Sequence, residues 1–322
     1  MKKILNIILL MGLATACESY MDYPDIRGDG KYYLECFPSS GPDSTSLVLY
    51  RTHPLNRDAR DYALAPVSAH LLVNDTPVAW QSTRKDGNGL LFSAATDLAE
   101  GDQVRLVVRE AGDDVVIAES CIPSPPRFTY RRVLTSNWND RYHVLLDSEE
   151  NAGRNYYGVR LEGLFRYTTR FPDGSVEVRD APMRDLRYGV NGSNDSLDLS
   201  GKVEGRFQSV SVAGQKMIVF EVDGSGDSPY ELLVDTPNIE DRIEWLYMDL
   251  PSHRRALYRL HLYRMSPAAY RFFVPQENEI LSGAGLVSPL TVQGNLKDAF
   301  GMVECVGGAS TEWLPALTQE GD

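Results

Sequence analysis

Residues 103–121 read QVRLVVREAGDDVVIAESC, and this stretch decides the fold class. In its first half, Val104, Leu106 and Val108 alternate with Gln103, Arg105 and Val107. This is the two-residue period of a half-buried β-strand. An Ala-Gly-Asp-Asp turn follows at 111–114, and a β-branched run returns after it. The stretch therefore predicts a β-hairpin.

Similar short segments precede this hairpin, separated by turn signals such as Asn-Asp-Thr-Pro at 74–77. Seven short strands with regularly spaced turns are typical of an immunoglobulin-like β-sandwich. Pro123, Pro125 and Pro126 end the unit, because proline cannot donate to a sheet ladder, so we expect this domain to span residues 31–124. The expected strands are 31–37, 46–51, 67–73, 78–81, 90–93, 103–109 and 115–121.

The remainder, residues 125–322, predicts a larger β-rich domain, either a sandwich or barrel-like, with one or two short helices. Pro-Asp-Gly within 171–175 lies between two β-prone runs and predicts a hairpin. Ser266-Pro267 predicts a helix start, with the helix body at 268–274. Residues 239–250 fit a helix or a strand equally well. The expected strands are 142–146, 156–170, 176–179, 207–212, 217–222, 230–234 and 258–265.

The first residues predict export and lipidation. Lys2 and Lys3 precede an apolar run, and small residues lead up to Cys17, so residues 1–16 resemble the signal peptide of a bacterial lipoprotein. We expect cleavage before Cys17 and acyl chains such as palmitate on that cysteine, which would anchor the protein in the outer membrane. Residues 17–30 are polar and predict a lipidated tether. We expect the anchored protein at the cell surface rather than at the periplasmic face of the outer membrane.

The charge balance limits the classes of partner. The 322-residue chain carries a formal charge of −13, and removal of Lys2 and Lys3 with the signal peptide would make it −15. A strongly acidic surface argues against nucleic acid and against direct binding to anionic lipid. The expected contact with the bilayer is therefore the acyl anchor alone.

Lipidation would leave three cysteines, Cys36, Cys121 and Cys305. An odd number in an oxidising compartment leaves at least one thiol unpaired. The sequence leaves open whether Cys36 and Cys121, near the two ends of the first domain, form a disulfide or stay as buried thiols.

The end of the chain carries a family resemblance. Residues 260–273 (LHLYRMSPAAYRFF), Pro289-Leu-Thr-Val, Asn295-Leu and Ala299-Phe-Gly-Met-Val follow one another, and residues 98–108 and 122–123 add matching motifs in the first domain. In this order they resemble a family of Bacteroidota lipoproteins catalogued as a domain of unknown function. Asp298-Ala-Phe and Glu304-Cys305 depart from the family pattern at the last motif.

The resemblance implies a functional setting but no site residues. Members of such families are typically encoded beside SusC-like TonB-dependent receptors of the outer membrane. It therefore implies an accessory role in the capture or import of a nutrient, with a TonB-dependent receptor as partner.

No arrangement of residues in the sequence carries a known chemistry. The motifs of zinc proteases, redox dithiols, serine hydrolases and phosphate-binding loops are absent from the sequence. Acidic pairs such as Glu149-Glu150 and Asp113-Asp114 lie beside turn residues and fit exposed turn carboxylates. We therefore expect no enzyme activity, no metal and no cofactor.

Aromatic residues are the one compositional indication of a binding surface. Seventeen tyrosines outnumber ten phenylalanines, and a tyrosine offers an apolar ring with a polar tip that suits a glycan, a peptide or a protein partner. Trp138, Tyr142, Tyr156 and Tyr157 are the candidate contacts, although aromatic residues favour strands in any case and packing within strands is the simpler explanation.

Three functions remain from the sequence alone. The first is a non-enzymatic lipoprotein that assists a TonB-dependent transporter. The second is a structural or adhesive surface protein of the fimbrial accessory type, a class that is also lipidated and all-β. The third is a hydrolase with an unusual pair of carboxylates.

Overall fold

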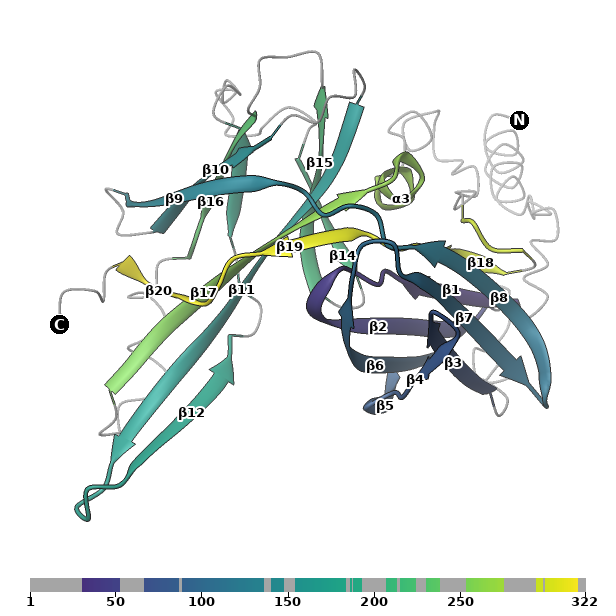
Figure 1. The fold of residues 1–322 in the computed structure, drawn as a ribbon, viewed down its shortest axis with the longest axis horizontal. Helices are drawn as coiled ribbons and strands as arrows, with labels where there is room; N and C mark the ends of the chain where they lie inside the picture. The colour runs from purple at the N-terminus through teal and green to yellow at the C-terminus, as the bar shows by residue number, and fades with distance from the viewer. Residues whose placement is uncertain are drawn as a thin grey trace, which may run out of the picture.

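The architecture is that of a computed structural model. It describes residues 31–52, 67–86, 89–135, 140–147, 154–183, 186, 188–192, 207–212, 215–223, 230–237, 253–274, 294–297 and 299–317. These residues form mainly antiparallel sheets with one short helix (Figure 1), so the all-β prediction is confirmed. Within these residues, no helix is long and apolar enough to span a bilayer.

The first sandwich consists of two packed sheets. Labelling β1 to β8 as strands A, B, C, C′, D, E, F and G gives the orders A-B-E-D and C′-C-F-G, which is the immunoglobulin-like arrangement expected from the sequence. The first sheet contains, in spatial order, β18 (Phe300–Val303), β1 (Tyr32–Cys36), β2 (Gly41–Arg51), β6 (Gly89–Leu98) and β5 (Ser82–Asp86). The second contains β4 (Thr76–Val78), β3 (Val67–Val73), β7 (Gln103–Glu110) and β8 (Asp113–Cys121).

Alternation of side chains builds the core of this sandwich. Leu106 and Val108 on β7 are fully buried and pack between the sheets with Leu34, Leu47 and Leu49. Along β1 and β7 every second residue is buried on the inner face, as the hairpin at 103–121 predicts.

The second sandwich is larger, and its described strands form two open sheets rather than the barrel-like alternative. Its smaller sheet contains β13 (Gly189–Gly192), β16 (Tyr230–Asp235), β10 (Asp140–Leu146) and β9 (Phe128–Leu134). Its larger sheet contains β14 (Phe207–Val212), β15 (Gln215–Asp223), β11 (Arg154–Arg170), β17 (His253–Met265) and β19 (Gly307–Ser310), with β12 (Val176–Pro182) beside β11 and β20 (Leu314–Pro315) beside β17.

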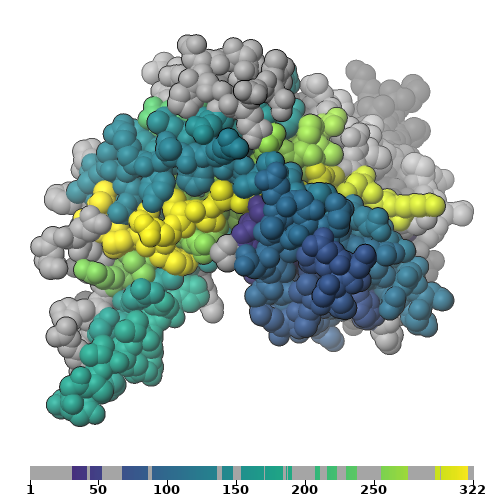
Figure 2. Space-filling model, viewed as in Figure 1, coloured from purple at the N-terminus to yellow at the C-terminus, as the bar shows by residue number. Residues whose placement is uncertain are grey.

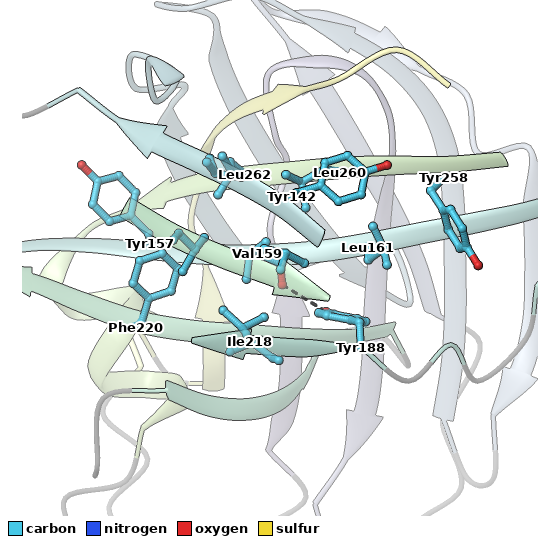
Figure 3. Packing of buried hydrophobic residues seen from close by; sticks show 14 of the residues in the cluster. Tyr142, Tyr157, Val159, Leu161, Tyr188, Ile218, Phe220, Tyr258, Leu260 and Leu262 are labelled. Carbon is cyan, nitrogen blue, oxygen red and sulfur yellow. Dashed lines mark hydrogen bonds between the residues drawn. The ribbon is translucent and has the colours of Figure 1, made fainter. Parts of the chain in front are cut away.

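The core of the second sandwich is rich in aromatic rings. The Tyr157 and Phe220 rings stack at 5.7 Å between centroids, and Tyr142 and Tyr258 are fully buried (Figure 3). The hydroxyl of Tyr188 lies 3.1 Å from the carbonyl oxygen of Val159, which satisfies a polar atom inside an apolar core.

The chain returns to the first sandwich near its end. β18 pairs in parallel with β1, so Tyr33 lies opposite Phe300 and Cys36 opposite Val303. The side chain of Asn295 holds the end of β18 in place. Its Nδ2 donates to the carbonyl of Val303 at 2.7 Å, and its Oδ1 accepts from the Val303 amide at 3.1 Å. The first sandwich is therefore not built only from residues 31–124, because its outermost strand comes from the segment expected in the second domain.

The two sandwiches touch through a tight joint. A Cβ at Gly307 would lie 2.3 Å from the carbonyl oxygen of Ser124, and one at Gly308 would lie 2.8 Å from that of Ser40, so only glycine permits this approach. The Ser40 hydroxyl also bridges the amide and the carbonyl of Gly308 at 2.7 and 2.9 Å. Backbone contact of this kind leaves little room for one sandwich to move against the other.

The single described helix, α3 (Pro267–Phe273), packs into the same joint. The Ser266 hydroxyl accepts from the amides of Ala268 and Ala269 at 3.1 Å, so the predicted helix start is confirmed. The Phe273 ring lies 4.7 Å from that of Phe37 in the first sandwich. An apolar cluster therefore joins α3 to both sandwiches.

Several expected segments have different ends or a different structure. The strand expected at 90–93 spans Gly89–Leu98, and Gly189–Gly192, which was not among the expected strands, forms β13 because it pairs with β16. The undecided segment 239–250 lies outside the described residues.

Candidate contact surface

A long β-hairpin projects from the larger sheet. β11 is seventeen residues long, and its second half pairs with β12 from Leu164↔Pro182 to Arg170↔Val176. In Figure 1 this hairpin extends away from both sandwiches, and Figure 2 shows it as an arm at the lower left of the molecule. The arm is the most prominent feature among the described residues.

A well-formed turn closes the arm, as the Pro-Asp-Gly signal predicts. The Phe171 amide donates to the Ser175 carbonyl at 2.9 Å, and Gly174 has φ +84°, a conformation that favours glycine. The carboxylate of Asp173 accepts from the amide and the hydroxyl of Ser175 at 2.9 and 2.6 Å. These bonds, led by that to the hydroxyl, lower the pKa of Asp173.

One face of the arm exposes apolar side chains. Val176 and Val178 are 55% and 56% exposed, and Phe171 at the turn is 43% exposed. Alternation along β12 places both valines on one face, and Thr168 lies opposite Val178. The two exposed valines form a small apolar patch on a projecting element, which makes the arm a candidate contact surface.

Ion pairs flank the valines. Arg166 makes two bonds of 2.8 Å to the carboxylate of Asp180, and these bonds lower the pKa of Asp180. On the opposite face of β12, the Nε of Arg179 lies 2.7 Å from Oε1 of Glu177. The arm is therefore locally balanced in charge although the whole chain is acidic.

A row of polar side chains crosses the larger sheet nearer the joint. The ring of His261 is almost fully buried, and its Nε2 lies 2.9 Å from Oε2 of Glu162 while its Nδ1 lies 2.9 Å from the hydroxyl of Ser310. A carboxylate only accepts, so Nε2 carries a proton and a neutral ring accepts from Ser310 through Nδ1.

This row differs from the serine–histidine–acid arrangement of hydrolases. In that template, the serine bonds Nε2 and the acid bonds Nδ1, whereas His261 has the two nitrogens exchanged. The His261 and Tyr263 rings also lie parallel at 6.2 Å along the strand. Cross-strand stabilisation of β11, β17 and β19 is the role that this geometry supports.

Two of the described acidic residues at the 110–114 turn are also paired. Glu110 lies 3.6 Å from Arg51, and the carboxylate of Asp114 lies 2.5 Å from Nε of Arg109. Glu149 and Glu150 lie outside the described residues. Within the described part of the chain, no three His, Cys, Asp or Glu side chains are grouped so as to hold a metal ion.

Two of the predicted contact residues lie in the core. Tyr142 is fully buried on β10, and Tyr157 is 3% exposed on β11, so neither ring is available to a partner in this structure. Tyr156 points to the opposite side of β11, where its ring lies 4.7 Å from that of Tyr270 on α3. Trp138 and Cys17 lie outside the described residues.

The valines of the arm were not among the predicted contacts. The available sequence signal was the Pro-Asp-Gly turn between two β-prone runs. The sequence could not show which strands lie beside the outer half of β11. Among the described strands, only β12 on one side and β17 on the other pair with it.

The three cysteines of the described chain are free thiols. Cys36 and Cys305 are buried and Cys121 is exposed, so Cys36 and Cys121 do not form the disulfide that the sequence left open. Burial raises the pKa of Cys36 and, as the main cause, raises the pKa of Cys305 to about 12.

These thiols should differ sharply in reactivity. In a Cys17→Ser variant at pH 8, we expect one equivalent of a thiol reagent to react quickly, at Cys121, and two more only after unfolding, because buried protonated thiols are poor nucleophiles. Absorbance after addition of an aromatic disulfide reagent measures both phases. Fast reaction of three equivalents in the folded protein would contradict the burial of Cys36 and Cys305.

These features define the class of the protein, which is an all-β protein of two joined sandwiches with a projecting arm. The sequence matches the family described as Domain of unknown function (DUF4249) over residues 20–312, so the chain belongs to this family. No curated protein matches the chain.

Two adhesins are among the solved structures that the chain resembles. Adhesin InvE of Yersinia pseudotuberculosis is 11% identical at a TM-score of 0.22, with 74% of this chain and 57% of that chain covered. The collagen adhesin CNA of S. aureus is 7% identical at a TM-score of 0.19, with 74% and 88% covered. Likenesses this low carry no argument about function.

Proposed function

We propose that this protein is a non-enzymatic, lipid-anchored protein of the outer membrane that works by contact, as an accessory or ligand-capture partner of a TonB-dependent transporter. The observation that supports a contact function is the projecting arm with Val176 and Val178 exposed. Apolar side chains on a protruding element favour docking onto another macromolecule. The membrane location in this proposal rests on the predicted lipidation at Cys17. The transporter partnership rests on the family resemblance.

The joint between the sandwiches is consistent with such a role. Contacts at Gly307 and Gly308 bring the two backbones together, which would restrict movement of the arm against the first sandwich. A preorganised contact element loses less conformational freedom on binding than a flexible one. A tether at residues 17–30 would then set the height of the arm above the lipid.

The experiment is co-purification after mild detergent extraction of the producing cells. We expect a TonB-dependent receptor to co-purify with the wild-type protein and to be lost with Val176→Glu/Val178→Glu, because the added charges would have to be desolvated in the contact. Ile117→Glu, on exposed Ile117 of β8, is the matched control and should keep the receptor.

Two results would count against this proposal. A wild-type protein that brings down no receptor would exclude the transporter partnership. Equal co-purification by the double variant and the control would exclude the arm as the contact. Uptake of a fatty-acid label that is lost in Cys17→Ser tests the anchor separately.

A structural or adhesive surface protein is the second candidate function. The observation that favours it is that β12 pairs only with β11 among the described strands, which leaves an open sheet edge that could receive another strand. Electron microscopy of a deletion strain distinguishes the two, since only this second function predicts the loss of surface polymers.

A further inference from the structure

The outer edge of β12 presents regularly spaced backbone groups. Two bonds fix which residues face β11, because the Met183 amide donates to the Gly163 carbonyl at 2.8 Å and the Phe171 amide donates to that of Ser175 at 2.9 Å. In an antiparallel ladder the direction of these groups alternates with every residue. Odd-numbered residues of β12 therefore face β11, while Val176, Val178 and Asp180 direct their N–H and C=O groups outward.

The sequence of this edge is self-complementary. Val176–Asp180 reads VEVRD. If a second copy of β12 pairs antiparallel about Val178, each Glu177 lies opposite an Arg179 of the other copy. Val178 then lies opposite Val178 of the other copy, and Val176 lies opposite Asp180. The three outward-facing residues of each strand therefore all form hydrogen-bonded pairs.

The charged pairs occupy the favourable positions of such a ladder. Glu177 and Arg179 would form the non-hydrogen-bonded pairs, in which opposed side chains approach most closely. Their side chains are 41% and 75% exposed in the monomer and already lie 2.7 Å apart within one chain. Two copies would therefore bring four charges of alternating sign together.

We propose that β12 is a self-association edge, and that its occupant is the β12 strand of a second copy of this chain. The two larger sheets then become one continuous sheet across a two-fold axis at Val178. The valine faces of the two arms lie side by side, because side chains above the sheet stay free when its edges pair. This inference goes beyond the proposed transporter partnership and does not depend on it.

The size of the edge indicates where the association matters. Specific, stable complexes typically bury about 1,200–2,000 Å² of surface, and a ladder over one short strand buries much less. The dimer should therefore be weak in dilute solution. Confinement to a membrane raises the effective concentration and would favour it.

Charge exchange tests the register directly. In the purified full chain, Glu177→Arg and Arg179→Glu each place like charges opposite one another in a self-dimer, so each should weaken dimerisation by about tenfold or more. An equimolar mixture of the two variants restores opposite charges at both positions. We expect the mixture to form a heterodimer of wild-type affinity, measured by sedimentation velocity with one variant fluorescently labelled.

The mixture also excludes an effect on folding. A misfolded variant would not recover its association when it is mixed with another variant. The double variant Glu177→Arg/Arg179→Glu should dimerise as the wild type does, because its charges are exchanged and still complementary. Dimerisation that is equal in all variants, or single variants that stay monomeric when mixed, would overturn the proposal.

A covalent trap tests the position of the axis. Opposed residues in a hydrogen-bonded pair lie about 5.5 Å apart between Cα atoms, which is within reach of a disulfide. In a Cys17→Ser/Cys121→Ser background, Val178→Cys should form a disulfide-linked dimer under mild oxidation. Ile117→Cys, at a similarly exposed position of β8, is the control, and equal crosslinking by both variants or none by Val178→Cys would contradict the proposal.

Discussion

Replacing Gly301 by Ala should destabilise the protein by about 3 kcal/mol or more, because two independent costs add at this position. Gly301 has φ +95°, in the region that favours glycine, and a Cβ there would lie 1.9 Å from the carbonyl oxygen of Leu34. The contact is to backbone, so β18 would have to move away from β1. Urea unfolding followed by tryptophan fluorescence measures the loss.

Gly101→Ala is the matched control for this prediction. Gly101 also has a positive φ, +88°, but a Cβ there would meet no atom within 4 Å. Its substitution should cost only about 1–2 kcal/mol, the conformational cost alone. Equal losses in the two variants would show that β18 does not press against β1 as described.

Tyr142→Ala should destabilise the second sandwich by about 3–5 kcal/mol, the usual cost of removing a fully buried aromatic side chain. Tyr142 lies between the two sheets with Val144 and Leu146 in the same cluster. The ring of Tyr130 lies 6.2 Å away on β9 and is 37% exposed, so Tyr130→Ala is the control and should cost much less. Thermal unfolding followed by circular dichroism compares the two.

This comparison also decides between the two interpretations of Tyr142 in the sequence. As a core residue, its substitution lowers stability and affects binding only through the loss of folded protein. If Tyr142→Ala kept wild-type stability but lost a partner in co-purification, Tyr142 would be a contact residue after all, and the packing described for the second sandwich would be wrong.

The sequence revealed the local elements of the fold. Alternation at 103–108, the Pro-Asp-Gly turn and the Ser-Pro helix start each depend on neighbouring residues, and all three are confirmed. β5, with the sequence STRKD, was missed because it carries no apolar alternation and forms by pairing with β6. Propensity is a weak guide for such edge strands.

The long-range features were beyond sequence reasoning. The parallel pairing of β18 with β1 joins residues that are far apart, and no local pattern in Phe300–Val303 identifies its partner strand. The same holds for the candidate surface. Val176 and Val178 look like ordinary strand residues in the sequence, and their exposure follows only from where the other strands end.

The return of the chain to its first sandwich has a consequence for biogenesis. The pairing of Tyr33 with Phe300 closes a loop of 300 − 33 = 267 residues, so the first sandwich cannot acquire this strand until residue 300 has been synthesised. Closure of so long a loop is entropically costly and slow. If the chain is exported as proposed above, this topology would delay completion of the first sandwich until residue 300 has crossed the membrane, and the chain would remain a suitable substrate for the export machinery until then.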